Sequence, residues 1–133
     1  MVLLATLLVL GSCTRNHGDI GPWFGTWHVE SINVDGAPVT VEGDYFFQFQ
    51  SKVFRVSQVG DHEQLVESFG TWDEGDDGTM TITFPDPDVF YISMPGLEAS
   101  NTFAVTRVSS REVIFSRVTS TGSSVVYHLH KQP

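Results

Sequence analysis

The chain has little cysteine, little positive charge and no long apolar run, and each shortage excludes a class of protein. Its 133 residues include one cysteine, so no disulfide can form within the chain. Seven basic residues stand against 16 acidic ones, which gives a formal net charge of -9. Such a surface would repel phosphate backbones and excludes nucleic-acid binding. No apolar run reaches the roughly 20 residues that a membrane-spanning helix needs.

Aromatic residues, by contrast, are plentiful. The chain contains ten Phe, three Trp and three Tyr, and 41% of its residues are hydrophobic. A chain of this size and composition can bury a real core and need not be disordered. We therefore expect one folded domain, which we place at residues 23–133.

The first residues form a short apolar segment that ends in the only cysteine. Residues 2–10 are apolar apart from one threonine, and this is the length of a signal-peptide core. The tetrapeptide Leu10-Gly11-Ser12-Cys13 resembles the lipobox of bacterial lipoproteins, although the usual basic residues before the apolar run are absent. The resemblance implies that residues 1–12 are a signal peptide and that Cys13 is lipidated. The alternative is that residues 1–12 form a buried strand and Cys13 is an ordinary core residue.

Residues 13–22 are mostly polar, with two Gly and one Pro, and they are typical of a tether between a lipid anchor and a domain. Thr14 follows Cys13, and it is not the acidic residue that retains some bacterial lipoproteins in the inner membrane. We therefore expect the protein to lie in the cell envelope, attached to the outer membrane through Cys13. The sequence does not decide between the periplasmic and the surface face of that membrane.

The rest of the chain alternates apolar and polar residues between short turns, which predicts strands rather than helices. Met80, Ile82 and Phe84, for example, alternate with threonines. Eight short strands of this spacing are typical of an up-and-down barrel or a sandwich. The expected strands are 24–34, 43–50, 52–59, 64–73, 79–84, 101–108, 111–118 and 123–130.

Several motifs of the mature chain resemble one family. They are Gly25-x-Trp27, Phe69-Gly70-Thr71-Trp72 followed after a turn by residues 79–84, and Phe103-Ala104-Val105 leading to Val113-Ile114-Phe115. In this order they resemble the lipocalin-like domain of bacterial lipoproteins, over residues 23–131. The resemblance implies an all-β fold, a small eight-stranded antiparallel barrel with an apolar pocket. The chain departs from classical lipocalins by being shorter and by lacking a C-terminal helix signal.

Two regions are candidates for binding a small hydrophobic or amphipathic ligand. Phe47 and Phe49 lie with Tyr45 on one face of a predicted strand, although that face could equally be plain core. The long connection 85–99 is unusually apolar for a loop, and such connections often act as lids or binding segments. Alternatively, this connection is a structural cover. The residues we expect to contact the ligand are Phe47, Phe49, Phe90, Tyr91, Ile92 and Met94.

A second function is compatible with the same pattern. About eight strands enclose an interior that side chains just fill or that holds one small ligand. If side chains fill it, the barrel acts as an interaction module that contacts another envelope protein through 85–99. Trp27 and Trp72 fit either function, and we expect them to close the base of the barrel.

Metal and catalytic sites have weaker support. His28, His128 and His130 could approach one another if the last strand pairs with the first, as a zinc site requires, but polar outward faces also suit histidine. The acidic run 73–77 could bind calcium or form an ordinary hairpin turn. No serine lies in a nucleophile elbow. We expect no catalytic residue, no metal and no cofactor, and we do not expect an enzyme.

Overall fold

Along each strand, buried side chains alternate with more exposed ones, which is the pattern of a strand that covers a core with one face. In β3 (Asp44–Gln50), the buried residues are Tyr45, Phe47 and Phe49. Leu129, Tyr127 and Val125 form the same row in β9 (Ser124–Lys131). These apolar rows point to one shared interior, and their burial is the main stabilising contribution to the fold.

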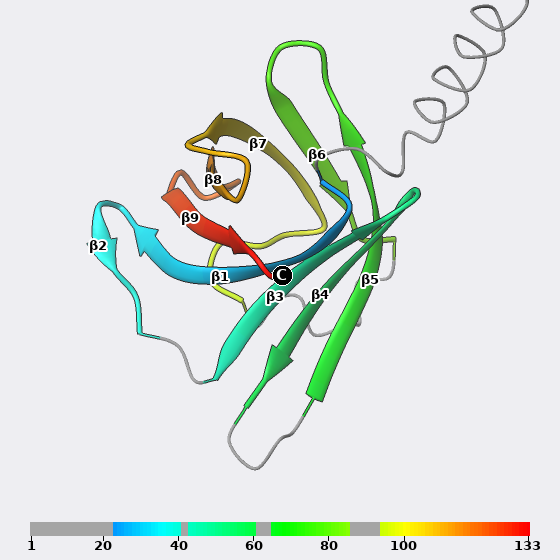
Figure 1. Ribbon diagram of the computed structural model, residues 1–133. Coiled ribbons are helices and arrows are strands. Elements are labelled where there is room, and N and C mark those ends of the chain that lie inside the picture. The colour runs from blue at the N-terminus through cyan, green and yellow to red at the C-terminus, as the bar shows by residue number, and fades with distance from the viewer. Residues whose placement is uncertain (1–22, 41–42, 61–64, 86–93) are drawn as a thin grey trace, which may run out of the picture.

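The computed structural model describes residues 23–40, 43–60, 65–85 and 94–133, and these form one antiparallel sheet (Figure 1). Neighbouring strands follow chain order from β3 to β9, and β1 pairs with both β3 and β9. That last pairing closes the sheet into a barrel. The remaining strands are β1 (Gly25–Val34), β2 (Ala37–Pro38), β4 (Val53–Val59), β5 (Leu65–Glu74), β6 (Thr79–Thr83), β7 (Ser100–Arg107) and β8 (Glu112–Val118).

The predicted all-β barrel is confirmed, and closure excludes the sandwich. The eight predicted strands agree with the structure to within one residue at each end. Sequence analysis missed only the two-residue β2, which pairs with the end of β1. Asp35 and Gly36 both have positive φ angles, 53° and 83°, as the tight turn between β1 and β2 requires. None of the described residues forms a helix that is long and apolar enough to cross a membrane.

Strand β6 is short because a proline stops its hydrogen-bonded pairing with β5. It pairs with β5 only over Thr71–Glu74. The same register would place Pro85 opposite Phe69, and proline has no N–H to donate. At the point where the ladder ends, the Thr83 carbonyl approaches Gly70 so closely that a Cβ there would lie 2.3 Å from it. The chain therefore leaves the sheet after β6, and its described part 94–99 returns across one end of the barrel.

The two ends of the barrel are named here by the residues that lie across them. The Trp23 end carries the start of β1 and the short turns β3–β4, β5–β6 and β7–β8. The Met94 end carries the links β1–β3, β4–β5, β6–β7 and β8–β9. In Figure 1 the β5–β6 hairpin projects beyond the other strands at the Trp23 end.

Candidate functional site

Aromatic rings from opposite walls meet in the centre of the barrel. Phe47 of β3 lies 5.8 Å from Tyr127 and 6.2 Å from Phe115, measured between ring centroids. Phe115 belongs to β8, three strands away from β3 around the barrel. Phe49 contacts Phe54 at 5.2 Å. Phe47 and Phe49 are fully buried, so a ligand could reach either of them only by displacing other rings.

The Trp23 end is closed by apolar packing. Trp23 lies just before β1, and its ring is 5.7 Å from Trp27 and 5.6 Å from Phe115. The Trp27 indole N–H donates to the Trp23 carbonyl over 3.1 Å, and the Trp23 indole N–H donates to Glu74 over 2.9 Å. Each buried indole thus satisfies its single donor.

Trp27 is fully buried in the core, so it packs in the barrel interior as expected, but the residue that covers it is Trp23. Trp72 is partly buried and packs against that core, 5.2 Å from Phe49. Trp23, whose role the sequence left open, turns out to be the residue that covers this end.

The Met94 end is covered by a short turn of the β6–β7 connection. The Leu97 N–H donates to the Met94 carbonyl over 3.1 Å, and both side chains are buried in the core. Gly96 has a φ of +82°, and a Cβ there would lie 2.5 Å from the Val125 side chain. Only glycine fits this position without strain.

Polar bonds hold this cover in place. The Arg117 guanidinium donates to the Gly96 carbonyl and to the Glu98 carboxylate, both over 2.7 Å. Only 8% of the Arg117 side chain is exposed. Ser120 donates its hydroxyl and its backbone N–H to the same carboxylate. The bonds from Ser120, assisted by Arg117, lower the pKa of Glu98 to about 2.

Two further residues attach the cover to the barrel. Asn101 is fully buried; its amide accepts from the Glu98 N–H over 2.8 Å and donates to the Glu98 and Ile82 carbonyls. The Tyr127 hydroxyl donates to the Pro95 carbonyl. Burial of this phenol raises its pKa far above the usual value, so Tyr127 keeps its proton and remains a donor.

A hollow of about 300 Å³ lies beside the cover. Its apolar wall consists of Val34, Met94, Leu97 and Val125. Its polar edge is formed by Glu98 together with hydroxyl residues of the β8–β9 link. The polar edge residues from that link are Thr119, Thr121 and Ser123.

The predicted ligand-contacting residues fall into three groups. Met94 lines the hollow, whereas Phe47 and Phe49 lie in the core. Phe90, Tyr91 and Ile92 lie outside the described residues, as does Cys13. The ligand-binding role of these residues stays a prediction. For segment 94–99, the cover interpretation matches the observed packing.

Sequence reasoning missed Arg117 and Asn101. Both continue an inward row, since Arg117 follows Val113 and Phe115 at alternate positions and Asn101 precedes Phe103. A polar residue at an inward position near a strand end requires a partner when it is buried. That signal was present in the sequence and could have identified both residues as attachment points.

The histidines lie side by side but do not converge on one point. The expected pairing of first and last strands places His28 directly opposite His130. His28 Nε2 lies 3.0 Å from Asp44, and His128 Nε2 lies 3.4 Å from Glu112. In the part of the chain that the structure describes, no group of three or more His, Cys, Asp or Glu side chains is arranged to hold a metal ion.

The acidic β5–β6 turn has the hydrogen bonds of a hairpin. The Gly75 N–H donates to the Thr79 carbonyl over 2.9 Å, and the Thr79 hydroxyl donates to Asp77 over 2.7 Å. Glu74 accepts the Trp23 indole N–H. These carboxylates thus support the turn and the Trp23 end.

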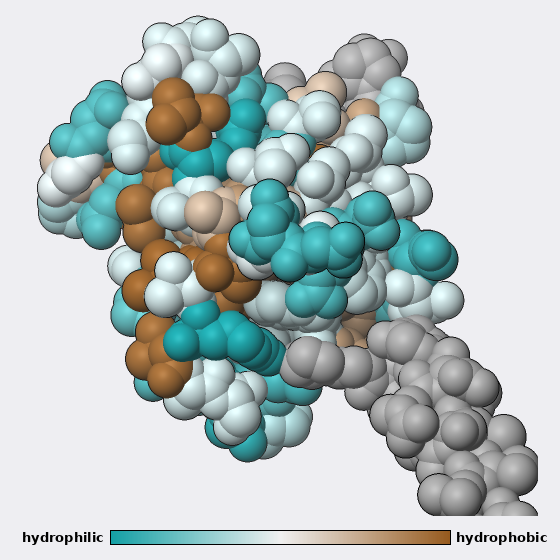
Figure 2. Space-filling model, turned by 90° about the horizontal axis from the view of Figure 1, so that it is seen from above, coloured by the Kyte–Doolittle hydropathy of each residue, from teal (hydrophilic) through white to brown (hydrophobic). Residues whose placement is uncertain are grey.

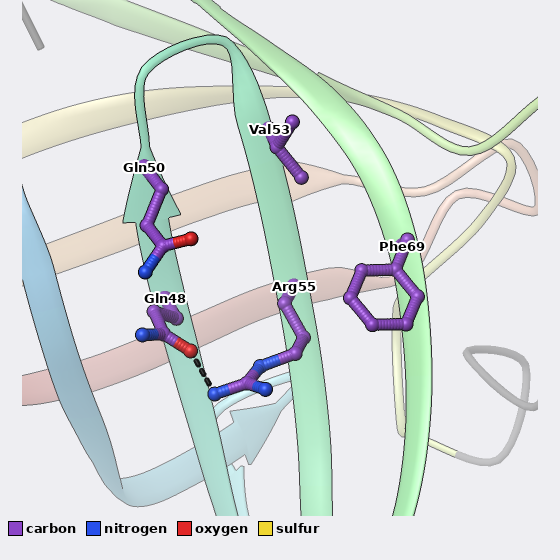
Figure 3. Close-up of a pocket in the computed structure, with 5 residues that line it drawn as sticks. All are labelled: Gln48, Gln50, Val53, Arg55 and Phe69. Atoms are coloured by element: carbon purple, nitrogen blue, oxygen red, sulfur yellow. Dashed lines mark hydrogen bonds between the residues drawn. The ribbon is translucent and has the colours of Figure 1, made fainter.

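A smaller depression of about 80 Å³ lies on the outer face of β3, β4 and β5. Figure 3 shows the Arg55 side chain extended between Gln48 and Phe69, and its guanidinium donates to the Gln48 amide. Arg55 also forms an ion pair with Glu67 over 2.8 Å. With its charge compensated and a volume of only about 80 Å³, this depression is a poorer ligand site than the hollow at the Met94 end.

Comparison with known proteins identifies the fold. No protein-family model and no curated protein sequence matches this chain. Among solved structures, a lipocalin-like protein from Bacteroides uniformis is similar over 84% of this chain and all of its own, with a TM-score of 0.65 and 19% identity. An uncharacterized protein from Bacteroides eggerthii covers 83% of this chain and 99% of its own, with a TM-score of 0.61 and 16% identity. A redesigned β-barrel has a TM-score of 0.52 and 21% identity over 84% of this chain and 93% of its own.

Proposed function

We propose that this lipocalin-like barrel is a lipid-anchored binding protein of the bacterial cell envelope, and that it holds a small amphipathic ligand at its Met94 end. The fold is compatible with a binding role. The proposal contains no catalytic step.

The hollow beside the cover carries the proposal. Its volume of about 300 Å³ lies at the lower limit for small-molecule sites. One wall is apolar, with Met94 and Leu97 from the cover and Val125 from β9. The opposite edge supplies hydroxyl groups and the Glu98 carboxylate. This division suits a ligand with a short apolar part and a hydrogen-bonding head.

The centre of the barrel is a less suitable site. A ligand there would have to replace contacts such as the one between Phe47 and Phe115. Opening that space would forfeit close packing among aromatic rings, and aromatic deletions in cores cost about 3–5 kcal/mol. The hollow needs no such rearrangement.

Attachment to the membrane is proposed from the sequence. The segment Leu10-Gly11-Ser12-Cys13 supplies the acceptor thiol, and acyl chains on Cys13 would each contribute about 0.8 kcal/mol per buried methylene. Two or three chains would anchor the protein stably. Thr14 favours the outer membrane as the location.

Native mass spectrometry of the gently purified protein, compared with its denatured mass, tests ligand binding. We expect the native mass to exceed the denatured one by a few hundred daltons, consistent with one small molecule. Equal masses, together with no uptake from a lipid extract, would contradict the binding function.

Matched tryptophan variants locate the ligand. Thr121→Trp places a large ring in the hollow, and Thr106→Trp places the same ring on an exposed outward position of β7. The additional mass should disappear in the first variant and persist in the second. Loss or retention of the ligand in both variants would place it elsewhere.

Attachment is tested separately by Cys13→Ser in the producing bacterium. We expect wild type in the membrane fraction and the variant outside it, with Ser12→Ala as a control that keeps a small residue before the cysteine. If the Cys13→Ser protein stays in the membrane fraction, the proposed lipid anchor at Cys13 is wrong.

The filled core supports a second function. A barrel with fully buried Phe47 and Phe49 and covers at both ends could act only through its surface, as a module that contacts another envelope protein. In that case no ligand would be found, and crosslinking from the Met94 end in intact cells would capture one defined protein.

A further inference from the structure

The positive charges of this acidic protein are unevenly placed. The structure describes six of the seven basic residues. Four of these lie at the Trp23 end, in or beside its turns: Lys52, Arg107, Arg111 and Lys131. At the Met94 end the basic residue is Arg117, which is almost fully buried and bonded to Glu98. Four of the six described basic residues are therefore concentrated at one end.

Apolar side chains are exposed among these cations. Phe24 is 41% exposed directly before β1, and Val108 is 55% exposed in the β7–β8 turn. Figure 2, which views the molecule from above Figure 1, shows hydrophobic side chains in brown beside hydrophilic ones in teal on that face of the molecule. We call this set the basic rim and define it as Phe24, Lys52, Arg107, Val108, Arg111 and Lys131.

Five described acidic residues lie at the same end, and four of them belong to the β5–β6 hairpin: Asp73, Glu74, Asp76 and Asp77. Asp76 and Asp77 are in the β5–β6 turn, and around the barrel this hairpin is opposite β9 and β1. Within the basic rim's own sector, Glu112 faces His128. A flat anionic surface would therefore attract the basic rim and repel the β5–β6 hairpin, which tilts the barrel.

The chain also enters the barrel at this end. Between the expected lipidation site Cys13 and Trp23 there are nine residues, 14–22. For a random coil of nine residues the root-mean-square span is about 17 Å, and the fully extended reach is about 30 Å. The anchor would thus hold the Trp23 end close to the membrane and leave the Met94 end farther away.

We propose that the basic rim docks on an anionic lipid surface, so that the Trp23 end faces the membrane and the hollow at the Met94 end faces away from it. This rests on the proposed lipid anchor at Cys13. The basic side chains contribute electrostatic attraction, and Phe24 and Val108 insert between headgroups.

Two exposed valines at opposite ends of β8 provide a matched test. Val108 precedes the strand at the Trp23 end, and Val118 ends it at the Met94 end with 66% exposure. In the lipidated protein Cys13 carries acyl chains, so Val108→Cys and Val118→Cys each introduce a single free thiol. Each variant receives an environment-sensitive fluorophore and is reconstituted with vesicles of phosphatidylethanolamine and 30% phosphatidylglycerol.

We expect a blue shift and quenching by a lipid-borne quencher for the label at position 108, and an aqueous spectrum for the label at position 118. If the protein floats with the vesicles but both labels remain aqueous, the anchor stands and the docking proposal is wrong. A stronger effect at position 118 would reverse the orientation. If the protein does not float, the anchor itself fails and the docking proposal falls with it.

Charge variants separate docking from simple proximity. Lys52→Gln and Arg111→Gln should each lower the ratio of docked to undocked label by about fivefold, the effect of removing one cation near an anionic surface. Asp76→Asn is the control on the opposite side and should not lower it. The same ratio measured on neutral phosphatidylcholine vesicles should be low in every variant. The proposal would be overturned if the ratio of docked to undocked label changed neither in the charge variants nor between anionic and neutral vesicles.

Discussion

The two ends of the barrel are closed in different ways. At the Trp23 end a single aromatic residue next to the first strand covers the core, and its contacts are mainly with other rings. At the Met94 end a turn of the chain crosses the barrel and depends on Arg117, Glu98 and Asn101 to stay there. The hollow that the described residues form lies beside the cover that polar bonds fasten. We therefore place the proposed binding site at the Met94 end.

The largest effect is expected at the apolar end. Trp23→Ala removes a buried ring that contacts three other aromatic rings, and it should lower the free energy of unfolding by about 3–5 kcal/mol. Urea denaturation measures the change. Phe24→Ala, next to it but 41% exposed, should cost less than about 0.5 kcal/mol. Equal effects of the two variants would mean that Trp23 does not close this end.

A smaller but clear effect is expected from the cover. Leu97→Ala shortens a buried side chain and should cost about 2–3 kcal/mol, because the turn near the surface can partly collapse into the space. Val118→Ala, at the same end but 66% exposed, serves as the control. If Leu97→Ala unfolds at the same urea concentration as wild type, the turn is not part of the cooperative core.

Loss of the fastening should act locally. Arg117→Met removes the cation that Glu98 and the Gly96 carbonyl share, and we expect a cost of about 1–3 kcal/mol. Hydrogen exchange should accelerate at the Leu97 amide, which bonds to Met94, and remain unchanged at the Gln132 amide, which bonds to Thr26 at the other end. Uniform acceleration at both amides would indicate global destabilisation instead.

The smallest effect concerns pH. Bonds from Ser120 and Arg117 lower the pKa of Glu98 to about 2, against an ordinary value of 4.5. The resulting stabilisation is present above about pH 4.5 and is lost as the pH falls toward 2. Because the side chain is 31% exposed, we expect it to contribute only about 1 kcal/mol.

Glu98→Gln tests this contribution. The difference in unfolding free energy between wild type and variant should be largest near pH 6 and should shrink as the pH falls toward 2. Asp76→Asn, in the exposed β5–β6 turn, is the comparison variant. A difference for Glu98→Gln that does not change with pH would show that the charge of Glu98 does not stabilise the cover.

The difference between the ends also explains what the sequence could predict. The strands follow from alternation and from turn residues a few positions apart, so their ends were predicted to within one residue. The same local pattern predicted that Trp27 packs in the barrel. The fastening of the cover depends on contacts such as Glu98 with Arg117, 19 residues apart. Alternation assigns each residue to a face but does not specify its partner.

The interior shows the same limit. The sequence placed Phe47 and Phe49 on the inner face correctly, but inward aromatic rows are the same in a filled barrel and in one that holds a ligand. Distances between rings on opposite walls decide between them, and the 6.2 Å between Phe47 and Phe115 is set by barrel geometry. Met94 was among the predicted ligand-contacting residues and lines the hollow, but Val34 and Val125 were missed because they border it from β1 and β9, which only the closure of the barrel brings together.

Methyl-resolved NMR of the protein during titration with octanol tests the central claim most directly. The account predicts early, saturable shifts for the methyl groups of Val34, Met94, Leu97 and Val125, which line the hollow. The methyl groups of Ile82 and Leu129, fully buried in the barrel, should remain in place. Shifts that begin at Ile82 and Leu129, or no saturable shift at all, would contradict binding at the Met94 end.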